Sequence, residues 1–290
     1  MTNLPKLAAL SGLSEIADKY GSILCDVWGV VHNGLSAHPA AVDALTRYRE
    51  QGGRVVLITN APRPSYKVVE QLDRLGVDRT AFDDVISSGD VARQFLEARP
   101  ADKIYHLGPD RDLPIYDGLA NAIVDESSAT LISCTGLFDD VSETPEDYAD
   151  QLARLAERGI VMLCVNPDKV VERGDQLVWC AGALAERYAA FGGETIIVGK
   201  PHAPIYEAAF ARLSTIAGHD VTKQSVLASG DGAATDLRGA FAQGISILFV
   251  TDGIHADEIS PGNHPDHASV GQFLAEADLS AEYFIRRLVW

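Results

Sequence analysis

Short apolar runs and helical patterns alternate along the N-terminal part of the chain. The run at residues 22–26 is too short for a helix and is typical of a buried strand, while residues 40–50 show helical spacing. A second apolar run at 55–58 is followed by helical spacing at 66–75, and residues 7–20 predict a further helix ahead of the first strand. This alternation predicts right-handed βαβ units, and therefore a parallel sheet with helices packed on its faces.

The pattern changes in the middle of the chain. After residue 88, strand candidates follow one another with little helix between them, which is typical of an α+β arrangement. The parallel alternation resumes near Ile196, and residues 279–290 suggest a terminal helix. We therefore expect an α/β protein with a Rossmann-like, doubly wound core at residues 1–87 and 195–290, interrupted by an inserted α+β domain at 88–194.

Charge and composition limit the kinds of partner. The 290 residues include 24 Lys and Arg against 41 Asp and Glu, a formal net charge of −17, so nucleic acid would be repelled. No apolar run approaches the ~18 residues that a membrane span needs, and the N-terminus lacks the layout of a secretory signal. The four cysteines are far apart in the sequence, as expected for free thiols in a reducing compartment. We expect a cytoplasmic protein that binds neither nucleic acid nor a membrane.

Polar side chains stand where the predicted core strands end. Asp26 ends the first strand, Thr59 ends the second, Lys200 follows the strand near Ile196, and Asp231 follows a strand predicted to begin at residue 225. The carboxyl ends of parallel strands share one edge of the sheet, where ligands bind in open α/β sheets. We therefore expect these side chains to converge at that edge.

Two carboxylates, an ammonium and a hydroxyl at one place can act on a phosphoryl group. Asp26 and Asp231 would hold Mg²⁺ through oxygen ligands. Lys200 would offset negative charge, and the Thr59 hydroxyl with nearby backbone N–H groups would bind the non-bridging oxygens. Asp26 could then attack phosphorus and form an aspartyl-phosphate. Asp236 follows Asp231 by five residues and could orient it or the waters of the metal.

Four segments resemble the four motifs of the haloacid dehalogenase superfamily, and the likeness covers nearly the whole chain. They are Asp26–Val30, Thr59–Asn60, Gly199–His202 and Gly230–Asp236. The large insertion between the second and third motifs is similar to that of subclass IIA, which includes the NagD-like, 4-nitrophenyl phosphate and pyridoxal phosphate phosphatases. Within the insertion, Asn166-Pro167-Asp168 and Cys180-Ala181-Gly182-Ala183 also resemble that subclass.

The resemblance implies roles for the residues that bind the reacting group. Asp26 would be both the nucleophile and a metal ligand. Thr59 and Asn60 would hold the phosphoryl group, and Lys200 would stabilise its charge. These roles imply a hydrolase that cleaves phosphoric monoesters through a covalent intermediate.

The resemblance also implies the metal ligands and the place of the substrate. Asp231 would bind Mg²⁺ directly, Asp236 would support it, and the backbone carbonyl of Trp28 would complete the protein ligands. The insertion would be a cap whose loop near Asn166 and Asp168 faces a small phosphorylated substrate. Related capped enzymes often pair through their caps, which would make a homodimer.

One position departs from the family pattern. The phosphatases of this family usually carry a second Asp two residues after the nucleophile, as general acid and then base, and this chain has Trp28 there. An indole exchanges no proton near neutral pH, and losing a positioned acid or base typically costs about 10²–10⁴ in rate. Three alternatives follow. In the first, the protein is a phosphatase whose substrate has a good leaving group, or in which another residue supplies the proton. In the second, the chemistry is not that of a phosphatase. In the third, the protein binds a phosphorylated ligand without turnover. The candidate proton donors are His32, Asp168 and His202.

The loop after Asp26 has a second interpretation. Trp28 can form a wall of the pocket and stack on an apolar part of the substrate, with Gly29 beside it and His32 on the same loop. A late group of histidines has the ligand types of a transition-metal site but irregular spacing, and we interpret it as a solvated loop: His255, His264 and His267. The function that the sequence favours is a Mg²⁺-dependent phosphohydrolase.

Overall fold

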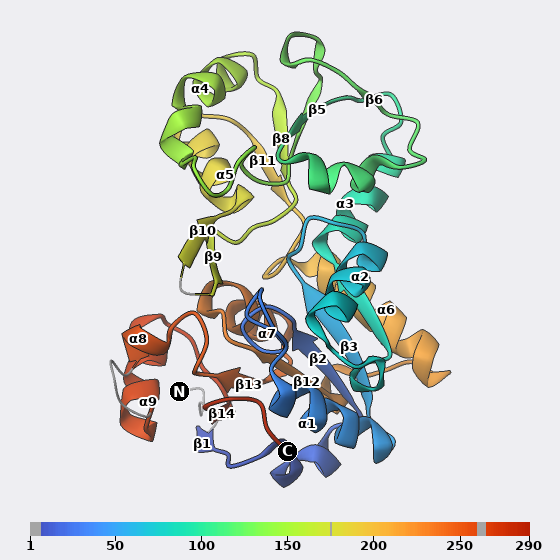
Figure 1. Cartoon of the computed structure of the whole chain (residues 1–290), viewed down its shortest axis with the longest axis vertical. Helices are drawn as coiled ribbons and strands as arrows, with labels where there is room; N and C mark the ends of the chain where they lie inside the picture. The colour runs from blue at the N-terminus through green and yellow to red at the C-terminus, as the bar shows by residue number, and fades with distance from the viewer. Residues whose placement is uncertain (1–6, 175, 260–264) are drawn as a thin grey trace. The chain divides into compact units, whose positions relative to one another are not determined.

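The computed structural model describes residues 7–174, 176–259 and 265–290, and Figure 1 shows their course. These residues form two compact units. The first takes in the chain up to Thr59, Val69–Ile86 and Tyr206–Trp290, and the second takes in Asn60–Val68 and Ser87–Ile205. The chain therefore enters and leaves the second unit twice, and the segment just after Thr59 belongs to it.

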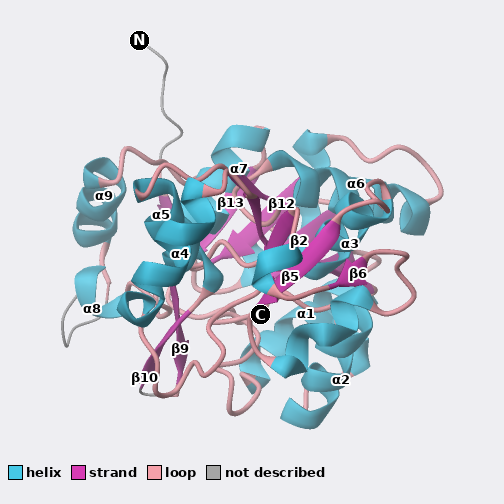
Figure 2. Ribbon diagram, turned by 90° about the horizontal axis from the view of Figure 1, so that it is seen from above, coloured by secondary structure: helices cyan, strands magenta, loops and turns pink. Residues whose placement is uncertain are grey.

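The first unit is built on a seven-stranded sheet with the order β1-β14-β13-β12-β2-β3-β4. The pairings from β1 through β3 are parallel, and Figure 2 shows β13, β12 and β2 side by side. The central strands β2 and β12 are buried along their whole length. The strands are β1 (Ala8–Ala9), β2 (Ser22–Asp26), β3 (Arg54–Thr59), β4 (Asp84–Ser87), β12 (Val226–Gly230), β13 (Ser246–Val250) and β14 (Tyr283–Ile285).

Amphipathic helices connect these strands. In the first of them, apolar residues at helical spacing pack into the core, and the Tyr48 hydroxyl donates a hydrogen bond of 2.6 Å to the Tyr20 carbonyl. The helices are α1 (Pro39–Glu50), α2 (Ser65–Leu75), α6 (Ala203–Ala217), α7 (Arg238–Gln243), α8 (Ala256–Ile259) and α9 (His267–Glu276). Short 3₁₀ turns lie at Leu13–Glu15, Ala17–Lys19, Arg79–Ala81 and Lys223–Ser225, and a π-helical turn lies at Ala233–Leu237.

The second unit has a five-stranded parallel sheet with the order β11-β8-β7-β5-β6 and a separate antiparallel pair, β9 and β10. The strands are β5 (Lys103–Leu107), β6 (Ala122–Ile123), β7 (Leu131–Cys134), β8 (Val161–Cys164), β9 (Val170–Arg173), β10 (Gln176–Trp179) and β11 (Thr195–Ile197). The helices are α3 (Ser88–Glu97), α4 (Ala149–Glu157) and α5 (Ala181–Ala190), with 3₁₀ turns at Asp110–Tyr116, Glu126–Ser128 and Pro145–Tyr148. Its core packs α4 and α5 against β7 and β8.

The α/β fold class predicted from the sequence is confirmed, and three local predictions are wrong. The predicted helix at 7–20 is replaced by β1 and two 3₁₀ turns, because Gly12 lies against the Trp290 carbonyl and β1 pairs with β14. The predicted helix at 279–290 contains β14 instead. The strand near Ile196 pairs with β8 of the second sheet, not with the core sheet, so that sheet extends past the predicted boundary at residue 194.

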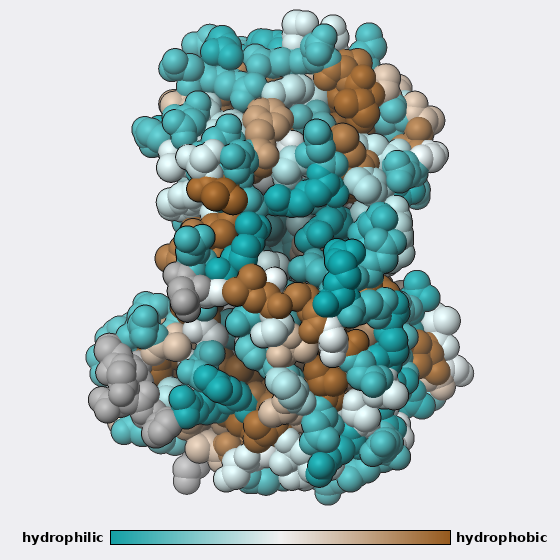
Figure 3. All heavy atoms as spheres, viewed as in Figure 1, coloured by the Kyte–Doolittle hydropathy of each residue, from teal (hydrophilic) through white to brown (hydrophobic). Residues whose placement is uncertain are grey.

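The face shown in Figure 3 is mainly hydrophilic, with hydrophobic residues gathered in small separate patches. Isolated exposed apolar side chains are ordinary on protein surfaces. No helix in the described part of the chain is long and apolar enough to cross a membrane.

Candidate active site

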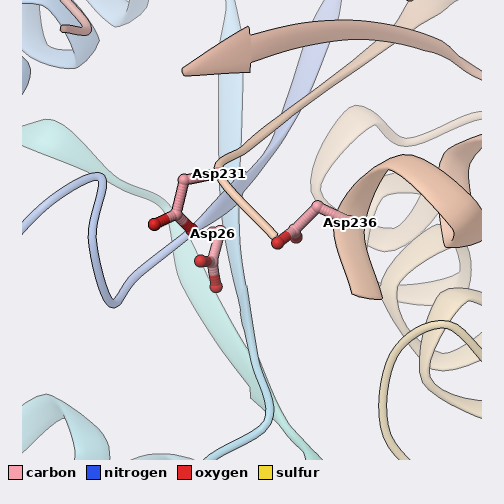
Figure 4. Close-up of side chains that lie close together, drawn as sticks. All are labelled: Asp26, Asp231 and Asp236. Atoms are coloured by element: carbon pink, nitrogen blue, oxygen red, sulfur yellow. The ribbon is translucent and has the colours of Figure 1, made fainter. Parts of the chain in front are cut away.

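Three carboxyl groups of the first unit converge at the carboxyl edge of its sheet. Asp26 is the last residue of β2, Asp231 directly follows β12, and Asp236 lies in the π-helical turn after it. Figure 4 shows their side chains pointing toward one another from these three segments. One oxygen of each lies within 4.8 Å of one oxygen of each of the others. Asp26 and Asp231 are 6% exposed and Asp236 is 5% exposed.

Strand register explains why Asp26 and Asp231 meet. β2 and β12 are parallel neighbours in which Cys25 pairs with Ser229, so the two chains leave the sheet side by side. The turn that follows β12 then folds Asp236 back. The Asp236 N–H donates to the Gly232 carbonyl at 2.8 Å, and the Gly232 N–H donates to Asp236 Oδ2 at 3.2 Å.

The Asp231 carboxylate is held by the loop that follows β13. Its Oδ2 accepts a hydrogen bond of 2.9 Å from the Ile254 N–H, and Gly253 lies so close that a Cβ there would overlap the carboxylate. His255 extends this support, because its Nε2 accepts from the Ala233 N–H at 3.2 Å while its Nδ1 lies 2.8 Å from Glu258 Oε2.

His255 is thus a site residue that the sequence reasoning missed, because we interpreted the late histidines as solvated. His267 does not join it: its Nε2 lies 3.0 Å from the Leu7 carbonyl. His264 lies outside the described residues. The only sequence signal for His255 was its position just past a core strand, where chains reach the ligand-binding edge.

The three buried carboxylates are suited to a cation. Like charges at this separation in a desolvated site destabilise one another unless a proton or a cation neutralises them. Oxygen ligands from one or two carboxylates, completed by water and a phosphate, are what Mg²⁺ prefers. The donor set of Asp26, Asp231 and Asp236 therefore fits Mg²⁺ by charge, burial and ligand type.

Trp28 and His32 pack against each other on the loop after Asp26. Their ring centroids are 5.0 Å apart in an edge-to-face arrangement, and a Cβ built at Gly34 would lie 2.6 Å from the indole. The buried His32 accepts a hydrogen bond of 2.9 Å at Nδ1 from the Gly34 N–H, and its carbonyl accepts from the Gly29 N–H at 2.8 Å. In neutral His32 the proton is therefore on Nε2.

Gly29 shapes the side of this loop that faces Asp231. Its φ of +87° is in the left-handed region, which favours glycine. A Cβ at this position would overlap Asp231 Oδ2. The residue therefore brings the loop backbone directly against a candidate metal ligand.

Four further predicted site residues belong to the second unit, where hydrogen bonds join all four of them. Asn60 Nδ2 donates to Asp168 Oδ1 at 2.9 Å, and Asn60 Oδ1 accepts from the Lys200 N–H at 2.7 Å. Asn166 Oδ1 accepts from the Asp168 N–H at 3.1 Å. Thr59, the buried last residue of β3, is joined to Asn60 by a peptide bond and lies beside β2, in which Asp26 pairs with Ile58. His202 has an exposed side chain.

Comparison with known proteins identifies the family. A family model of haloacid dehalogenase-like hydrolases matches residues 23–119, and a HAD-hydrolase-like model matches residues 197–277. The solved structure of a haloacid dehalogenase-like family hydrolase from Brucella suis 1330 is 44% identical in sequence, with a TM-score of 0.87. That alignment covers 97% of this chain and 100% of the Brucella chain.

Two more distant relatives carry names that state an activity. The ribonucleotide monophosphatase NagD of Escherichia coli K12 is 25% identical over 239 residues, 80% of this chain and 88% of NagD. The structure of 4-nitrophenylphosphatase from Thermotoga maritima is 21% identical with a TM-score of 0.70, covers 94% of this chain and 96% of that chain, and shares the fold.

A parallel α/β core with carboxylates at its strand ends, interrupted by a second α/β unit, is the architecture of a Rossmann-like hydrolase with an inserted domain. The chain belongs to the haloacid dehalogenase-like hydrolase family. Its relatives include NagD and 4-nitrophenylphosphatase, so the family and the IIA subclass predicted from the sequence are confirmed.

Proposed function

We propose that this protein is a Mg²⁺-dependent phosphohydrolase that acts on a small phosphorylated metabolite through an aspartyl-phosphate at Asp26. The observation that carries the proposal is the cluster of three buried carboxylates at the carboxyl edge of the core sheet. The names of NagD and of the Thermotoga enzyme support a phosphoric monoester as the substrate class. We also propose that the inserted unit acts as the cap.

Asp26 would act as the nucleophile. One of its carboxylate oxygens attacks phosphorus, the P–O bond to the leaving group breaks, and the electron pair leaves with the alkoxide or aryloxide. Water then attacks the phosphorus of the aspartyl-phosphate, which releases inorganic phosphate and restores the carboxylate. Asp231 and Asp236 would hold Mg²⁺ together with Asp26 and the Trp28 carbonyl. When bound, Mg²⁺ would offset the negative charge of the carboxylates and the phosphoryl oxygens.

Charge on the transferring group would be balanced by the remaining residues. The Thr59 hydroxyl would donate to a non-bridging oxygen, and the Lys200 ammonium would stabilise the charge that builds up in the transition state. Because the Asn60 side chain is hydrogen-bonded to Asp168 and Lys200, its contribution to phosphoryl binding would come from its backbone N–H.

Trp28 limits the substrates that can react. With no carboxyl at this position to protonate the leaving group, esters of acidic alcohols such as phenols or enols would react faster than alkyl esters. His32 could serve as a donor through Nε2–H, since its Nδ1 is an acceptor. Trp28 also favours a second candidate function, in which the protein binds a phosphorylated metabolite without turning it over.

The cellular setting of the proposal follows from the thiols and the charge. All four cysteines are buried thiols that form no disulfide, as is usual in a reducing cytoplasm. The net charge of −17 supports a small-molecule substrate and argues against nucleic acid as a partner. Pairing of two copies through the cap is the oligomeric state that we propose.

A phosphate-release assay tests the proposal. We expect wild-type protein with Mg²⁺ to hydrolyse 4-nitrophenyl phosphate and a subset of sugar, nucleotide and cofactor phosphates, and a chelator to stop the reaction. Asp26→Asn should abolish turnover. Beryllium fluoride with Mg²⁺ should give a bound ¹⁹F NMR signal in wild-type protein and none in Asp26→Asn. Binding of phosphorylated compounds without phosphate release from any of them would favour the second function.

A further inference from the structure

We propose that Asp168 is a positioning residue that holds Lys200 in place through the side-chain amide of Asn60. The inference rests on the proposed function, because it concerns the lysine that would stabilise the phosphoryl group. It assigns Asp168 a role different from substrate contact or proton donation. The three residues belong to distant parts of the sequence and to the same unit of the structure.

Asn60 is bonded to both polar groups of the Lys200 backbone. Its Oδ1 accepts from the Lys200 N–H at 2.7 Å, and its Nδ2 donates to the Lys200 carbonyl at 3.3 Å. A backbone N–H can only donate, so Oδ1 and not the NH₂ group must face it, which fixes the orientation of the amide. This two-point contact sets the place where the Lys200 side chain begins.

Asp168 accepts the other Nδ2 hydrogen of Asn60. Nδ2 lies 2.9 Å from Asp168 Oδ1, so the two N–H groups and the oxygen of the amide all have partners. Both Asn60 and Lys200 are buried. A hydrogen bond to a carboxylate is stronger than one between neutral groups, so Asp168 is the partner best able to hold the amide in its orientation.

The loop that carries Asp168 is itself held by hydrogen bonds and close packing. Asn166 Oδ1 accepts from the Asp168 N–H at 3.1 Å, and the Gly182 N–H donates to the Asp168 carbonyl at 3.1 Å. Gly182, in the first turn of α5, lies so close to this loop that a Cβ there would overlap the Pro167 carbonyl. The two sequence segments of the insertion that resemble subclass IIA therefore pack on each other, and together they hold the backbone of Asp168.

Gly199 completes the contact from the other side. A Cβ at this residue would lie 2.5 Å from Asn60 Oδ1 and 2.7 Å from Pro167 Cδ, so any side chain there would push the segments apart. The backbone before Lys200, the Asn60 amide and the Asn166–Asp168 loop are thus in direct contact. Loss of the Asp168 acceptor would leave a buried N–H unpaired and loosen the backbone of Lys200.

The test compares Asp168→Ala with Asp168→Asn, which keeps an acceptor oxygen in the same place. With 4-nitrophenyl phosphate and Mg²⁺, Asp168→Ala should lower kcat by about ten- to a hundredfold with little change in KM, as for loss of one hydrogen bond to a charged group. Asp168→Asn should stay within about threefold of wild type, since its amide oxygen can accept from Asn60. Asp125→Ala, which removes an exposed carboxylate of the same unit, is the control and should match wild type.

A double-mutant cycle separates positioning from substrate contact. If Asp168 acts through Asn60, the double variant Asp168→Ala, Asn60→Ala should be no slower than Asn60→Ala alone. Additive losses, or a rise in KM with unchanged kcat, would overturn the proposal. Asp168→Leu, which lacks an acceptor but keeps the branching at Cγ, replaces Asp168→Ala if that variant does not fold.

Amide hydrogen exchange tests the same contact without turnover. The Lys200 N–H is bonded to Asn60 Oδ1, so its exchange should be about tenfold faster or more in Asp168→Ala than in wild type or Asp168→Asn. Unchanged exchange would overturn the proposal. If wild-type protein releases no phosphate from any substrate, the proposed function fails, and the exchange measurement still decides whether Asp168 holds Lys200.

Discussion

The backbone of Gly29 lies directly against the Oδ2 atom of Asp231, so that a Cβ at residue 29 would overlap this oxygen. Gly29→Ala should therefore displace a candidate Mg²⁺ ligand, and it also forces an alanine to adopt a φ of +87°. We expect about a tenfold or larger loss of Mg²⁺ affinity, as for other changes that shift a metal ligand. The measurement is the Mg²⁺ concentration at half-maximal phosphate release, with isothermal titration of Mg²⁺ as a second readout.

Gly21→Ala is the matched control for this prediction. Gly21 is exposed, and a Cβ built there would meet no heavy atom within 4 Å. Its Mg²⁺ dependence should equal that of wild type. The same Mg²⁺ midpoint in both alanine variants would contradict the role given to Gly29.

Trp28 should limit the rate with alkyl phosphates, because it stands where a proton donor is expected. Trp28→Asp should raise the ratio of kcat/KM for alkyl phosphates to kcat/KM for 4-nitrophenyl phosphate. A general acid supplies about 10²–10⁴-fold in rate, and the gain should be in that direction. Trp28→Asn has the shape of the aspartate and no titratable proton, so it should show no such gain. Both variants lose the contact with His32 and Gly34 and should be less stable by about 3 kcal/mol, as for removal of a large aromatic side chain. Equal rate changes in the two variants would mean that the proton comes from elsewhere.

His255 should stabilise the turn that carries Asp236, a candidate metal ligand. Its Nε2 accepts from the Ala233 N–H in the turn that carries Asp236. His255→Ala would leave that N–H without its acceptor, and we expect Mg²⁺ affinity to fall by about tenfold, as for changes in groups that orient metal ligands. His267→Ala, in the same C-terminal region, should leave the Mg²⁺ dependence unchanged. Isothermal titration with Mg²⁺ checks both, and a weaker effect for His255→Ala than for His267→Ala would refute the assignment.

The sequence was sufficient to predict the elements whose signal is local. Asp26, Thr59 and Asp231 each end an apolar run long enough to be recognised as a buried strand, and parallel strands bring such ends to one edge. Strand β14 is only three residues long, which is too short for alternation to distinguish it from a helix. The antiparallel pair β9 and β10 has a local signal in the sequence, since Gly-Asp at residues 174–175 is a typical hairpin turn sequence.

The parts of the site that could not be predicted depend on tertiary contacts. Thr59-Asn60 suggested two residues that bind the phosphoryl group, but the Asn60 amide finds its partners 108 and 140 residues later in the chain. His255 shares a Pro- and Gly-rich loop with other histidines, and only its position just past a core strand separates it from them. Side-chain hydrogen bonds of this kind are set by how the elements pack, and the types of the residues alone do not reveal them.

Asp112 should make stability depend on pH in the second unit. Its side chain is 2% exposed, and burial raises the pKa of this carboxyl to about 6 even though Arg63 lies 3.5 Å away. A raised pKa in the folded state means that ionisation opposes folding. The resulting penalty is absent below the unfolded pKa near 3.8, grows as the pH rises, and is complete above about 6.

Asp112→Asn removes this titration. The free energy of unfolding of this variant should therefore rise relative to that of wild type as the pH rises. Between pH 4 and pH 7 we expect the difference in the free energy of unfolding to shift by about 2–3 kcal/mol in favour of Asp112→Asn. Urea denaturation at four or five pH values measures it. Other titrating groups, such as the half-buried His106 with its pKa lowered to about 4, are present in both proteins and largely cancel. A difference that stays constant with pH would show that the Asp112 carboxyl has no raised pKa in the folded protein.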